Sequence, residues 1–596
     1  MKYKLLSKIN SPKDLKGFDI ATLVDVNKEI RELIVDTVSK NGGHLAANLG
    51  IVELTCALHY VFDCPNDKIV WDVGHQAYAH KILTGRFSKF HTLRQYKGIS
   101  GFPNKYESEY DIFTTGHSST SISQAFALAC ARDLQKKKEK VIAVIGDGSL
   151  SGGMAFEALN NAGHSAKDLI VVLNDNEMAI SKNVGALSEY LTRIITAPIY
   201  KKVRTEVRSF LKKLPDFFGE RALYTAEKIE ESLKGLLVPG MLFEELGFFY
   251  VGPIDGHDLN SLIHTFRNIK LFDNPVLIHV ITKKGKGYAP AENQPISYHG
   301  TGSFNKEDGA ALAGKESKTF TNCFTEAIDE ISVKDEKIIA ITAAMPDGVG
   351  LCDFCKKYPD RFFDVGIAEQ HAVTFAGGLA VAGFKPIFAV YSTFLQRAYD
   401  QIIHDVCLQD APVIFAIDRV GLVGEDGPTH HGVFTVPFLR NIPKLNLAFP
   451  KTGKELKEML KLSVSLKEPF AVCYPKASIP DDVFADIKQS KVEFGKSELI
   501  IKGRDVVIFA LGPMVVNSLE AVRLLEKQGI SAGLINVRFV NPFDEELLLE
   551  TVKHVKNIVT VEEGILSGGF GSLVMEVLGK NNITDVKVKR IGLPNE

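Results

Sequence analysis

Residues 141–176 have the sequence VIAVIGDGSLSGGMAFEALNNAGHSAKDLIVVLNDN. The apolar runs at 141–145 and 169–173 are typical of strands that are buried on both faces of a parallel sheet. Residues 153–163 lie between them and have a helical pattern, so the stretch predicts a strand, a turn, a helix and a second strand. Chains built from such units form α/β folds with mainly parallel sheets.

Polar residues follow both predicted strands. Asp147 comes directly after the first strand, and Asn176 ends the second. Open parallel sheets bind ligands at the carboxyl ends of their strands, and carboxylate and amide oxygens suit Mg²⁺. The glycines beside Asp147 let a phosphate approach the backbone at the start of the helix. The stretch therefore predicts a site for a Mg²⁺-bound diphosphate, and GDG followed by NDN resembles the thiamine-diphosphate motif. An ordinary turn after a core strand is the alternative.

The composition is that of an ordinary soluble globular protein. The chain has 596 residues, of which 45% are hydrophobic and 24% charged, and its net charge is −2. Such a charge favours neither nucleic acid nor an anionic membrane, and no apolar run reaches the roughly 18 residues of a membrane helix. The N-terminus lacks a signal-peptide pattern, and scattered cysteines are typical of reduced thiols, so we expect a cytoplasmic protein.

Alternating strands and helices predict three doubly wound domains with mainly parallel sheets. We expect the domains to cover residues 1–310, 311–485 and 486–596. Residues 183–240 differ from their surroundings, because they are rich in Lys, Arg and Glu and have helical periodicity. This pattern is typical of a solvated amphipathic helix, and a mobile cover over the site is the alternative.

Two short motifs favour no function. Cys352 and Cys355 form a lone CxxC without the second pair of ligands that a zinc site needs, so packing or surface thiols are the favoured interpretation. Residues 568–571 form a partial glycine-rich turn, and no full GxGxxG directly follows a strand. A dinucleotide site is therefore disfavoured.

A second reactive element lies at residues 364–371, DVGIAEQH. Glu369 stands at a predicted strand-to-helix junction, where a carboxylate in the first helical turn is ordinary. Thiamine diphosphate, however, reacts only as a carbanion, which forms when a carboxylate beside the aminopyrimidine favours its imino tautomer. We therefore predict that Glu369 activates the cofactor.

Motifs in matching order along nearly the whole chain resemble one enzyme family. They are Gly42–His44, Asp72–Tyr78, Thr115–Ser119, the GDG and NDN pair, Thr282–Tyr288, Val365–His371, Tyr391–Asp400 and Gly424–His430. Together they resemble the 1-deoxy-D-xylulose-5-phosphate synthases, a family of transketolase-like thiamine-diphosphate enzymes. The block at 391–400 distinguishes this family from transketolase itself.

The resemblance implies an architecture and a reaction. It implies a homodimer whose chains have a diphosphate-binding domain (1–310), a pyrimidine-binding domain (311–485) and a transketolase C-terminal domain (486–596), with each active site between the first two domains of one subunit. It further implies that pyruvate and D-glyceraldehyde 3-phosphate are joined with loss of CO₂, in a reaction that needs thiamine diphosphate and Mg²⁺ and supplies isoprenoid, thiamine and pyridoxal synthesis.

The resemblance also implies roles for single residues. The metal ligands would be Asp147, Asn176 and the backbone carbonyl of Met178. The cofactor contacts would be His75, Gly116, His117, Ser118, Gly148, Ser149, Asn176, Tyr288 and Glu369. The substrate contacts would be Tyr391, Arg397, Arg419, Asp426, His430, Lys476 and Lys284. His44, His75 and His430 would join Glu369 in catalysis, because histidine exchanges protons near neutral pH.

Two features depart from the family pattern. Lys476 stands where the family usually has an arginine that can grip the aldehyde's phosphate, and a lysine cannot form the bidentate fork of a guanidinium. We expect a weaker phosphate contact there, while for Arg397 and Arg419 a surface ion pair is the alternative role. The family also continues for a short tail beyond residue 596, which puts the last elements of the third domain in doubt.

Other classes of protein fit less well. A transketolase or the decarboxylase component of a dehydrogenase would keep both the GDG motif and Glu369, and CO₂ release that depends on the aldehyde would separate them. A non-catalytic protein on the same fold is disfavoured, because Asp147, Glu369 and the histidines are all present. An NAD-dependent enzyme would need a glycine fingerprint and an acidic ribose partner that the chain lacks.

Overall fold

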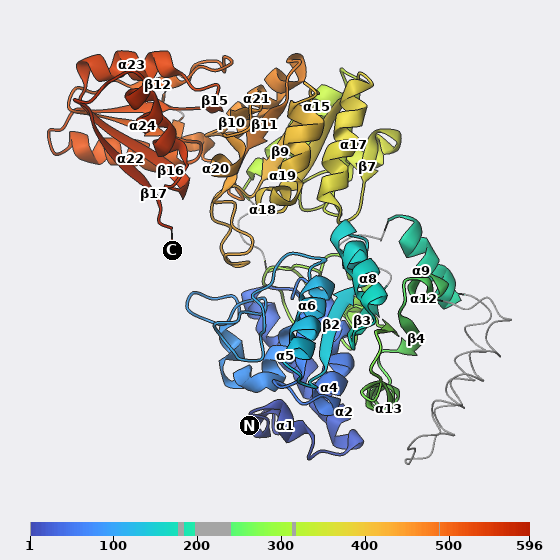
Figure 1. Ribbon diagram of the computed structural model, residues 1–596. Helices are drawn as coiled ribbons and strands as arrows, with labels where there is room; N and C mark the ends of the chain where they lie inside the picture. The colour runs from blue at the N-terminus through green and yellow to red at the C-terminus, as the bar shows by residue number, and fades with distance from the viewer. Residues whose placement is uncertain are drawn as a thin grey trace. The chain divides into compact units, whose positions relative to one another are not determined.

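Three sheets form the framework of the part of the chain that the structure describes. This computed structural model describes residues 2–176, 184–196, 240–312, 317–484, 486–487 and 489–595. The first sheet lies in one compact unit, residues 1–313, and the other two lie in a second unit, residues 314–596. Figure 1 labels the elements of both units. The predicted fold class is confirmed, whereas the domain boundaries at 310 and 485 stay predictions.

The first sheet is parallel throughout, with the strand order β1-β2-β3-β5-β4. Its strands are β1 (Lys68–Trp71), β2 (Val141–Gly146), β3 (Ile170–Asp175), β4 (Phe249–Asp255) and β5 (Val276–Ile281). The apolar runs at 141–145 and 169–173 correctly predict β2 and β3. Because the strands are parallel, the residues that follow β1, β2, β3 and β5 lie together at the carboxyl ends of the strands, which we call the ligand-binding edge of the sheet.

Helices cover both faces of this sheet. The helices described in the first unit are η1 (Leu6–Lys8), α1 (Pro12–Leu15), α2 (Ile20–Asn41), α3 (Ala46–Gly50), α4 (Val52–Val61), α5 (Tyr78–Lys81), η2 (Ile82–Arg86), η3 (Phe87–Thr92), α6 (Ser121–Leu134), α7 (Asp147–Leu150), α8 (Gly153–Ser165), α9 (Ala186–Thr196), α12 (Met241–Glu245), α13 (Leu259–Ile269) and α14 (Ala289–Asn293). Successive strand residues point to opposite faces. Ile142 and Val144 of β2 therefore pack with α2, α4 and α13, while Ala143 and Ile145 pack with α6 and α8.

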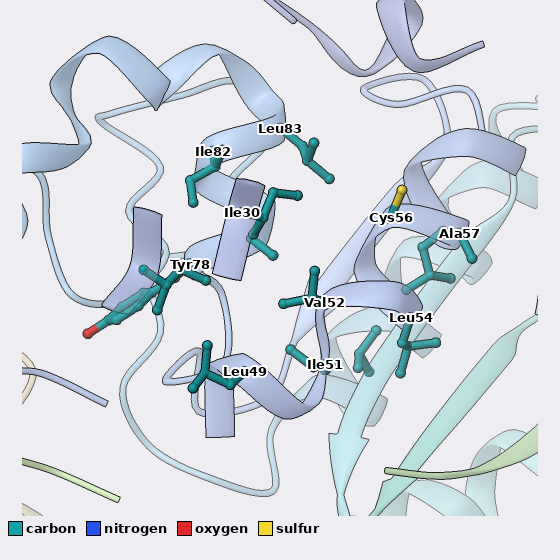
Figure 2. Close-up of a cluster of buried hydrophobic side chains, with 14 of the residues drawn as sticks. Ile30, Leu49, Ile51, Val52, Leu54, Cys56, Ala57, Tyr78, Ile82 and Leu83 are labelled. Carbon is teal, nitrogen blue, oxygen red and sulfur yellow. The ribbon is translucent and has the colours of Figure 1, made fainter. Parts of the chain in front are cut away.

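The first of these cores anchors the helix that follows the predicted site residue His75. Figure 2 shows Tyr78 of α5 and Ile82 and Leu83 of η2 packed with Ile30 of α2 and Val52 of α4. All five side chains are at most 1% exposed. Burying an aliphatic side chain of this size stabilises a fold by about 1.5–3 kcal/mol. The packing of these buried side chains therefore fixes the backbone next to His75.

Part of the predicted helical insert at 183–240 is described. Helix α9 confirms helix within it, and residues 197–239 lie outside the described residues. Within the described ranges, no helix combines the length and the apolar character needed to cross a lipid bilayer.

The second unit contains two sheets, each with one antiparallel edge strand. The second sheet has the order β15-β10-β11-β9-β8-β6-β7, and β15 is its antiparallel strand. The third has the order β12-β14-β13-β16-β17, and β12 is antiparallel. The strands are β6 (Ile338–Thr342), β7 (Phe362–Asp364), β8 (Lys385–Tyr391), β9 (Ile414–Asp418), β10 (Asn446–Ala448), β11 (Phe470–Cys473), β12 (Glu498–Ile501), β13 (Val506–Ala510), β14 (Ala532–Asn536), β15 (Phe539–Asn541), β16 (Asn557–Ile565) and β17 (Lys587–Leu593).

Helices also pack between and beside these strands. The described helices of the second unit are α15 (Phe320–Ser332), α16 (Cys352–Lys357), η4 (Pro359–Arg361), α17 (Glu369–Val381), α18 (Ser392–Leu395), η5 (Gln396–Ala398), α19 (Tyr399–Gln401), η6 (Ile402–Cys407), α20 (Thr435–Leu439), α21 (Gly453–Ser465), η7 (Asp481–Phe484), α22 (Met514–Glu526), α23 (Glu545–His554) and α24 (Phe570–Lys580). Thr319 caps helix α15 by accepting a hydrogen bond from the Asn322 N–H.

A buried ionic cluster joins the two sheets of the second unit. Lys451 contacts Glu455 of α21 at 2.6 Å and Glu498 of β12 at 2.8 Å, and Arg538 contacts Glu455 at 2.8 Å. These side chains are at most 4% exposed. Removing one member of a buried pair costs about 3–5 kcal/mol, because the partner's charge is left without compensation. The cluster therefore holds residues of the predicted second and third domains together.

Candidate active site

The predicted metal ligands Asp147 and Asn176 follow neighbouring strands of the first sheet. Asp147 is buried and begins α7, so residues 147–150 form a helical turn where the sequence predicts a plain turn. The side-chain oxygen of Asn176 is buried and has no hydrogen-bond partner among the described residues. Met178, the third predicted ligand, lies outside the described residues. Asp147 and Asn176 thus present hard oxygens at the ligand-binding edge of a parallel sheet.

The neighbouring Asn174 has a structural role instead. Its side-chain N–H donates to Gln76 at 2.8 Å, and its oxygen accepts from the Thr282 hydroxyl at 2.7 Å. These bonds connect β3 to the segments that follow β1 and β5. Of the two asparagines in the NDN motif, only Asn176 keeps a buried oxygen available for a ligand.

Asp72 holds the predicted cofactor residues 116–118 next to α7. Its buried carboxylate accepts hydrogen bonds from the backbone N–H groups of Ser119 at 2.7 Å and Ser121 at 3.0 Å. The Ser119 hydroxyl then donates to the backbone carbonyl of Ser149 at 2.7 Å. Gly116, Ser118, Gly148 and Ser149 are buried here, and His117 is half-buried. The structure therefore brings these five predicted cofactor residues together.

Three histidines form a cluster beside this edge. The ring centres of His44 and His75 are 5.7 Å apart, and His299 lies 5.5 Å from His44 and 5.4 Å from His75. Burial, together with the other cations nearby, holds the pKa values of His75 and His299 well below the usual range, so both are neutral at neutral pH. The sequence does not predict His299 as a site residue, because a lone histidine in a loop carries no local signal.

The side-chain amine of Lys284 is buried near Asp147, one of the predicted metal ligands. Burial lowers the pKa of its side chain to about 8, while the charge of Asp147 acts in the opposite direction. Lys284 is a predicted substrate contact and Asp147 a predicted metal ligand. The two lie close enough for their charges to interact. Tyr288 follows on the same segment, and its hydroxyl donates to the backbone carbonyl of Lys306 at 3.0 Å.

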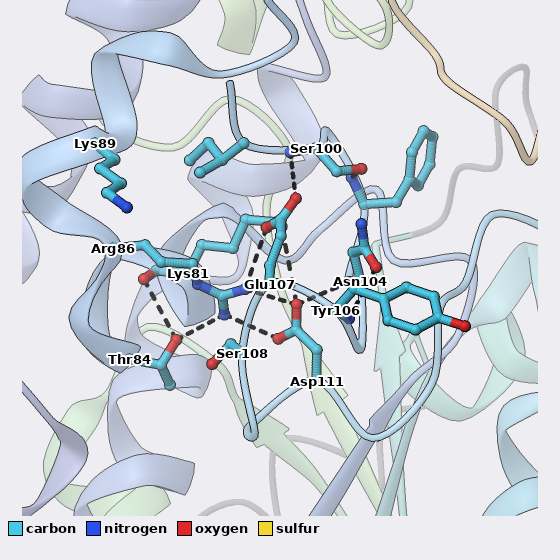
Figure 3. Close-up of polar contacts among 12 residues, drawn as sticks. Lys81, Thr84, Arg86, Lys89, Ser100, Asn104, Tyr106, Glu107, Ser108 and Asp111 are labelled. Carbon is cyan, nitrogen blue, oxygen red and sulfur yellow. Dashed lines mark hydrogen bonds and ion pairs between the residues drawn. The ribbon is translucent and has the colours of Figure 1, made fainter. Parts of the chain in front are cut away.

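A buried polar cluster braces the loop that leads to residues 116–118 (Figure 3). Arg86 donates through both terminal nitrogens to Asp111, at 2.6 and 2.8 Å, and Lys81 donates to Glu107 at 2.7 Å. Asp111 also accepts the backbone N–H of Asn104 at 2.8 Å. Because Lys81 and Arg86 belong to α5 and η2, the cluster ties this loop to the segment that carries the first predicted cofactor contact.

Glu369 is the first residue of α17 in the second unit, as its place at a strand-to-helix junction predicts. It is 3% exposed, and one of its carboxyl oxygens has no hydrogen-bond partner within the described chain. Burial raises its pKa, while the charge of Arg397 acts in the opposite direction. The turn before it is fixed by Asp364, which accepts the N–H groups of Ala344 at 2.8 Å and Gly366 at 3.0 Å.

Tyr391 and Arg419 form a stacked pair at the carboxyl ends of β8 and β9. The guanidinium carbon of Arg419 lies 4.1 Å from the centre of the Tyr391 ring, and the guanidinium pairs with the fully buried Asp418. The Thr321 hydroxyl donates to the same carboxylate at 2.9 Å. Burial raises the pKa of Tyr391 to about 12, so its hydroxyl stays protonated at neutral pH. Arg419 is thus not a surface ion pair but an oriented, partly buried cation.

A line of aromatic rings connects Tyr391 to His430. Phe394 stacks on Tyr391 at 5.8 Å and meets His430 edge to face at 5.6 Å. The His430 ring nitrogen Nδ1 lies 3.0 Å from the Thr429 hydroxyl. Asp426 is close enough to Tyr391 to contribute to raising its pKa. The structure therefore places four predicted residues, Tyr391, Arg419, Asp426 and His430, in one region.

Lys476 is more exposed than these residues. Its amine lies 3.8 Å from the Glu425 carboxylate, and 45% of its side chain is exposed. An exposed pair at this distance contributes little binding energy of its own. Lys476 therefore reaches the same loop as Asp426, but without a rigid contact.

Among the described residues, the CxxC motif has no partner ligands for a metal ion. All eight cysteines are free thiols, and within the described ranges no group of three or more candidate ligands surrounds Cys352 and Cys355. Burial raises the pKa of Cys352. The interpretation of the two cysteines as packing or surface thiols stays a prediction.

Comparison with known proteins identifies the family. Residues 6–282 match the family model for 1-deoxy-D-xylulose-5-phosphate synthase, residues 316–481 match the transketolase pyrimidine-binding domain, and residues 495–596 match the transketolase C-terminal domain. The chain is 52% identical to the 1-deoxy-D-xylulose-5-phosphate synthase of Halothermothrix orenii over 99% of this chain and 93% of that protein. It is 53% identical to that of Desulfitobacterium hafniense, over the same shares.

A solved structure of transketolase from Campylobacter jejuni superposes with a TM-score of 0.39 at 16% identity, over 95% of this chain and 98% of that one. The sequence relatives, with more than half of their residues identical over nearly the full length, are sufficient for assignment. The chain belongs to the 1-deoxy-D-xylulose-5-phosphate synthase family and is thus a transketolase-like, thiamine-diphosphate-dependent transferase.

Proposed function

We propose that this chain joins pyruvate to D-glyceraldehyde 3-phosphate, with loss of CO₂, to give 1-deoxy-D-xylulose 5-phosphate. The observation that carries the proposal is Glu369, a buried carboxyl with one oxygen that no described residue binds. A buried polar atom without a partner costs about 1–3 kcal/mol, so its presence favours a ligand that supplies the partner. The aminopyrimidine ring of thiamine diphosphate, the family's cofactor, has a nitrogen that can be the hydrogen-bond partner of this carboxyl oxygen.

The residues of the first unit fit the diphosphate end of the cofactor and a metal ion. Asn176 has a buried oxygen that needs a partner, and Asp147 supplies a buried carboxylate at the start of a helix. We assign Mg²⁺ to Asp147, Asn176 and the backbone carbonyl of Met178. We assign the cofactor to His75, Gly116, His117, Ser118, Gly148, Ser149, Asn176 and Tyr288, together with Glu369.

Thiamine diphosphate, when bound, supplies a nucleophilic carbon and accepts the electrons that decarboxylation releases. Glu369 has a raised pKa, so it is suited to share a proton with a ring nitrogen. His75 and His299 are neutral because burial lowers their pKa values, and a neutral imidazole donates a proton at one nitrogen and accepts at the other. The ring of His44 lies within 5.7 Å of both, so the three histidines are candidates for the proton transfers.

The second unit supplies the groups for the aldehyde. Tyr391 stays a hydrogen-bond donor because of its raised pKa, and Arg419 is held in place beside it. We assign the aldehyde's phosphate to Tyr391, Arg397, Arg419 and Lys476. We assign its hydroxyl and carbonyl oxygens to Asp426 and His430, and the carboxylate of pyruvate or the phosphate of the aldehyde to Lys284.

The setting is also proposed. We expect a homodimer that acts in the cytoplasm, with residues 1–310, 311–485 and 486–596 as its diphosphate-binding, pyrimidine-binding and C-terminal domains. A net charge of −2 agrees with a protein that acts on small molecules rather than on nucleic acid.

A coupled assay on the purified chain with thiamine diphosphate and Mg²⁺ tests the proposal. CO₂ release from pyruvate should depend on added D-glyceraldehyde 3-phosphate and should match the formation of 1-deoxy-D-xylulose 5-phosphate. Efficient transfer from a ketose phosphate without CO₂ release would instead show a transketolase.

A further inference from the structure

Residues 419–434, which we call the acceptor loop, join β9 to α20. The loop contains Arg419, Asp426 and His430, three of the residues assigned to the aldehyde. Its two stems pair with each other, because the Gly421 N–H donates to the Gly432 carbonyl at 3.2 Å and the Gly432 N–H donates to the Gly421 carbonyl at 2.7 Å. The position of this paired base therefore determines where the assigned side chains lie.

The third sheet contacts the base of the acceptor loop. Beyond the middle of β16, the Ile565 N–H donates to the Val433 carbonyl at 3.2 Å. The Glu563 carboxylate lies against the other stem: a Cβ atom added to Gly421 would come 2.5 Å from its Oε2. Gly421 also has a φ of 83°, which favours glycine. Both stems are thus supported by one strand of the third sheet.

The contact with Glu563 is polar. Burial raises the pKa of the Glu563 carboxyl, and the nearby backbone N–H of Leu422 acts in the opposite direction. A cavity of about 30 Å³ adjoins the contact and is lined by Val420, Gly432 and Glu563 among others. Apart from this carboxylate, the stem is held by backbone hydrogen bonds, from the Val420 N–H to the Tyr474 carbonyl at 3.1 Å and between Gly421 and Gly432.

The preceding residue has a different task. The Glu562 carboxylate accepts the N–H groups of Phe570 and Gly571, each at 2.8 Å, at the start of α24. The N–H groups of the glycine-rich turn at 568–571 are therefore bound to a carboxylate of the chain itself. Glu562 stabilises the third sheet, whereas Glu563 contacts the acceptor loop, and the two adjacent carboxylates form a matched pair for experiment.

We propose that Glu563 is a positioning residue for the acceptor loop, through which the C-terminal part of the chain sets the affinity for the phosphorylated aldehyde. The inference rests on the proposed function. Without the carboxylate, the stem at Gly421 and Leu422 loses one of its contacts, and Asp426, further along the loop, no longer meets the aldehyde in a fixed geometry. No residue of the acceptor loop is assigned to pyruvate, so the binding of pyruvate stays unchanged.

Steady-state kinetics of the full chain, with thiamine diphosphate and Mg²⁺, test this inference. Glu563→Ala should raise the KM for D-glyceraldehyde 3-phosphate about five- to tenfold, since one hydrogen bond to a charged group is lost, with a smaller change in kcat. The KM for pyruvate should stay at the wild-type value. Glu563→Gln keeps an oxygen for the Leu422 N–H and should stay within about twofold of wild type. Glu562→Gln should lower the Tm but leave the KM for the aldehyde unchanged.

Three results would overturn the inference: an unchanged aldehyde KM in Glu563→Ala, an equal rise in both KM values, or an equal rise in Glu562→Gln. If Glu563→Ala does not fold, Glu563→Met, which keeps the length but no acceptor, takes its place with the same criteria. A wild-type chain that forms no product would contradict the proposed function itself, and this outcome is separate from the behaviour of the variants.

Discussion

The guanidinium of Arg419 lies 4.1 Å from the centre of the Tyr391 ring while the buried carboxylate of Asp418 pairs with it. Two neighbours thus orient one cation at the carboxyl ends of adjacent strands. A lysine would keep the charge but lose both the flat face and the fork of the guanidinium.

Arg419→Lys should therefore raise the KM for D-glyceraldehyde 3-phosphate about tenfold and leave the KM for pyruvate unchanged. Arg361→Lys is the matched control, because Arg361 lies 4.0 Å over the ring of Tyr358 but has no assigned role. If the control raised the aldehyde KM to the same extent, the effect would not come from phosphate binding.

Lys476→Arg should strengthen binding of the aldehyde. The lysine is 45% exposed and only 3.8 Å from Glu425, so it holds a loose contact with the acceptor loop. An arginine can grip a phosphate with two parallel hydrogen bonds, and we expect the KM for the aldehyde to fall about threefold. Lys444→Arg, at the exposed pair with Asp410, should change nothing. Equal changes in the KM values for both substrates would contradict the assignment.

Asp111→Asn should destabilise the fold in a pH-dependent way. Burial raises the pKa of Asp111, but hydrogen bonds from His80 and Arg86 outweigh burial and hold this pKa well below its usual range. A depressed carboxyl pKa stabilises the fold above the ordinary Asp value of about 4 and ceases to do so as the pH falls. The variant should lose about 3–5 kcal/mol of unfolding free energy at pH 7, because the buried Arg86 loses its close charge partner and keeps only a 3.5 Å contact with Glu107.

Urea unfolding at several pH values measures this loss, which should shrink below about pH 4 as the wild type itself loses the contribution. Asp133→Asn serves as the control, because Asp133 pairs with Arg132 while 34% of its side chain is exposed. A loss of the same size at every pH would show that the charge of Asp111 is not the cause.

Glu369→Gln should stabilise the cofactor-free protein at neutral pH. Burial raises the pKa of this carboxyl, and a raised acid pKa gives stability that is present at low pH and is lost as the pH rises through the folded-state value. Glutamine does not ionise, so the Tm of the variant should exceed that of the wild type at pH 7, and the difference should vanish near pH 4. The exposed Glu520→Gln should show no such trend. A variant that is less stable than the wild type at pH 7 would contradict the reasoning.

The centre of the first sheet could be predicted from sequence, whereas its edge strand β4 and the edge strand β17 of the third sheet could not. Strands such as β2 and β3 are buried on both faces, and their apolar runs follow directly from that burial. Strand β17 lies at an edge, and most of its residues are partly or fully exposed, so its sequence KVKRIGL has no apolar run. Strand β4 is also an edge strand, and it contains Gly252 and Pro253, which usually mark turns.

Site residues could be predicted where they belong to motifs with a fixed chemistry. Asp147 and Asn176 follow predicted strands. Glu369 is predicted because the cofactor needs a carboxylate beside its aminopyrimidine ring. His299 has no such context, and only the fold brings it within 5.4 Å of His75. The pairing of Arg86 with Asp111 is likewise invisible in sequence, because it depends on how a long loop returns to η2. The role of Met178 stays a prediction.

Glu369→Ala is the most direct test of the account. The variant should form 1-deoxy-D-xylulose 5-phosphate about 10²- to 10⁴-fold more slowly than the wild type, as expected when a positioned proton-transfer group is removed. Binding of thiamine diphosphate, measured by quenching of the intrinsic fluorescence in the presence of Mg²⁺, should persist, because the diphosphate is assigned to the first unit. Undiminished product formation by a folded Glu369→Ala variant would contradict the mechanism.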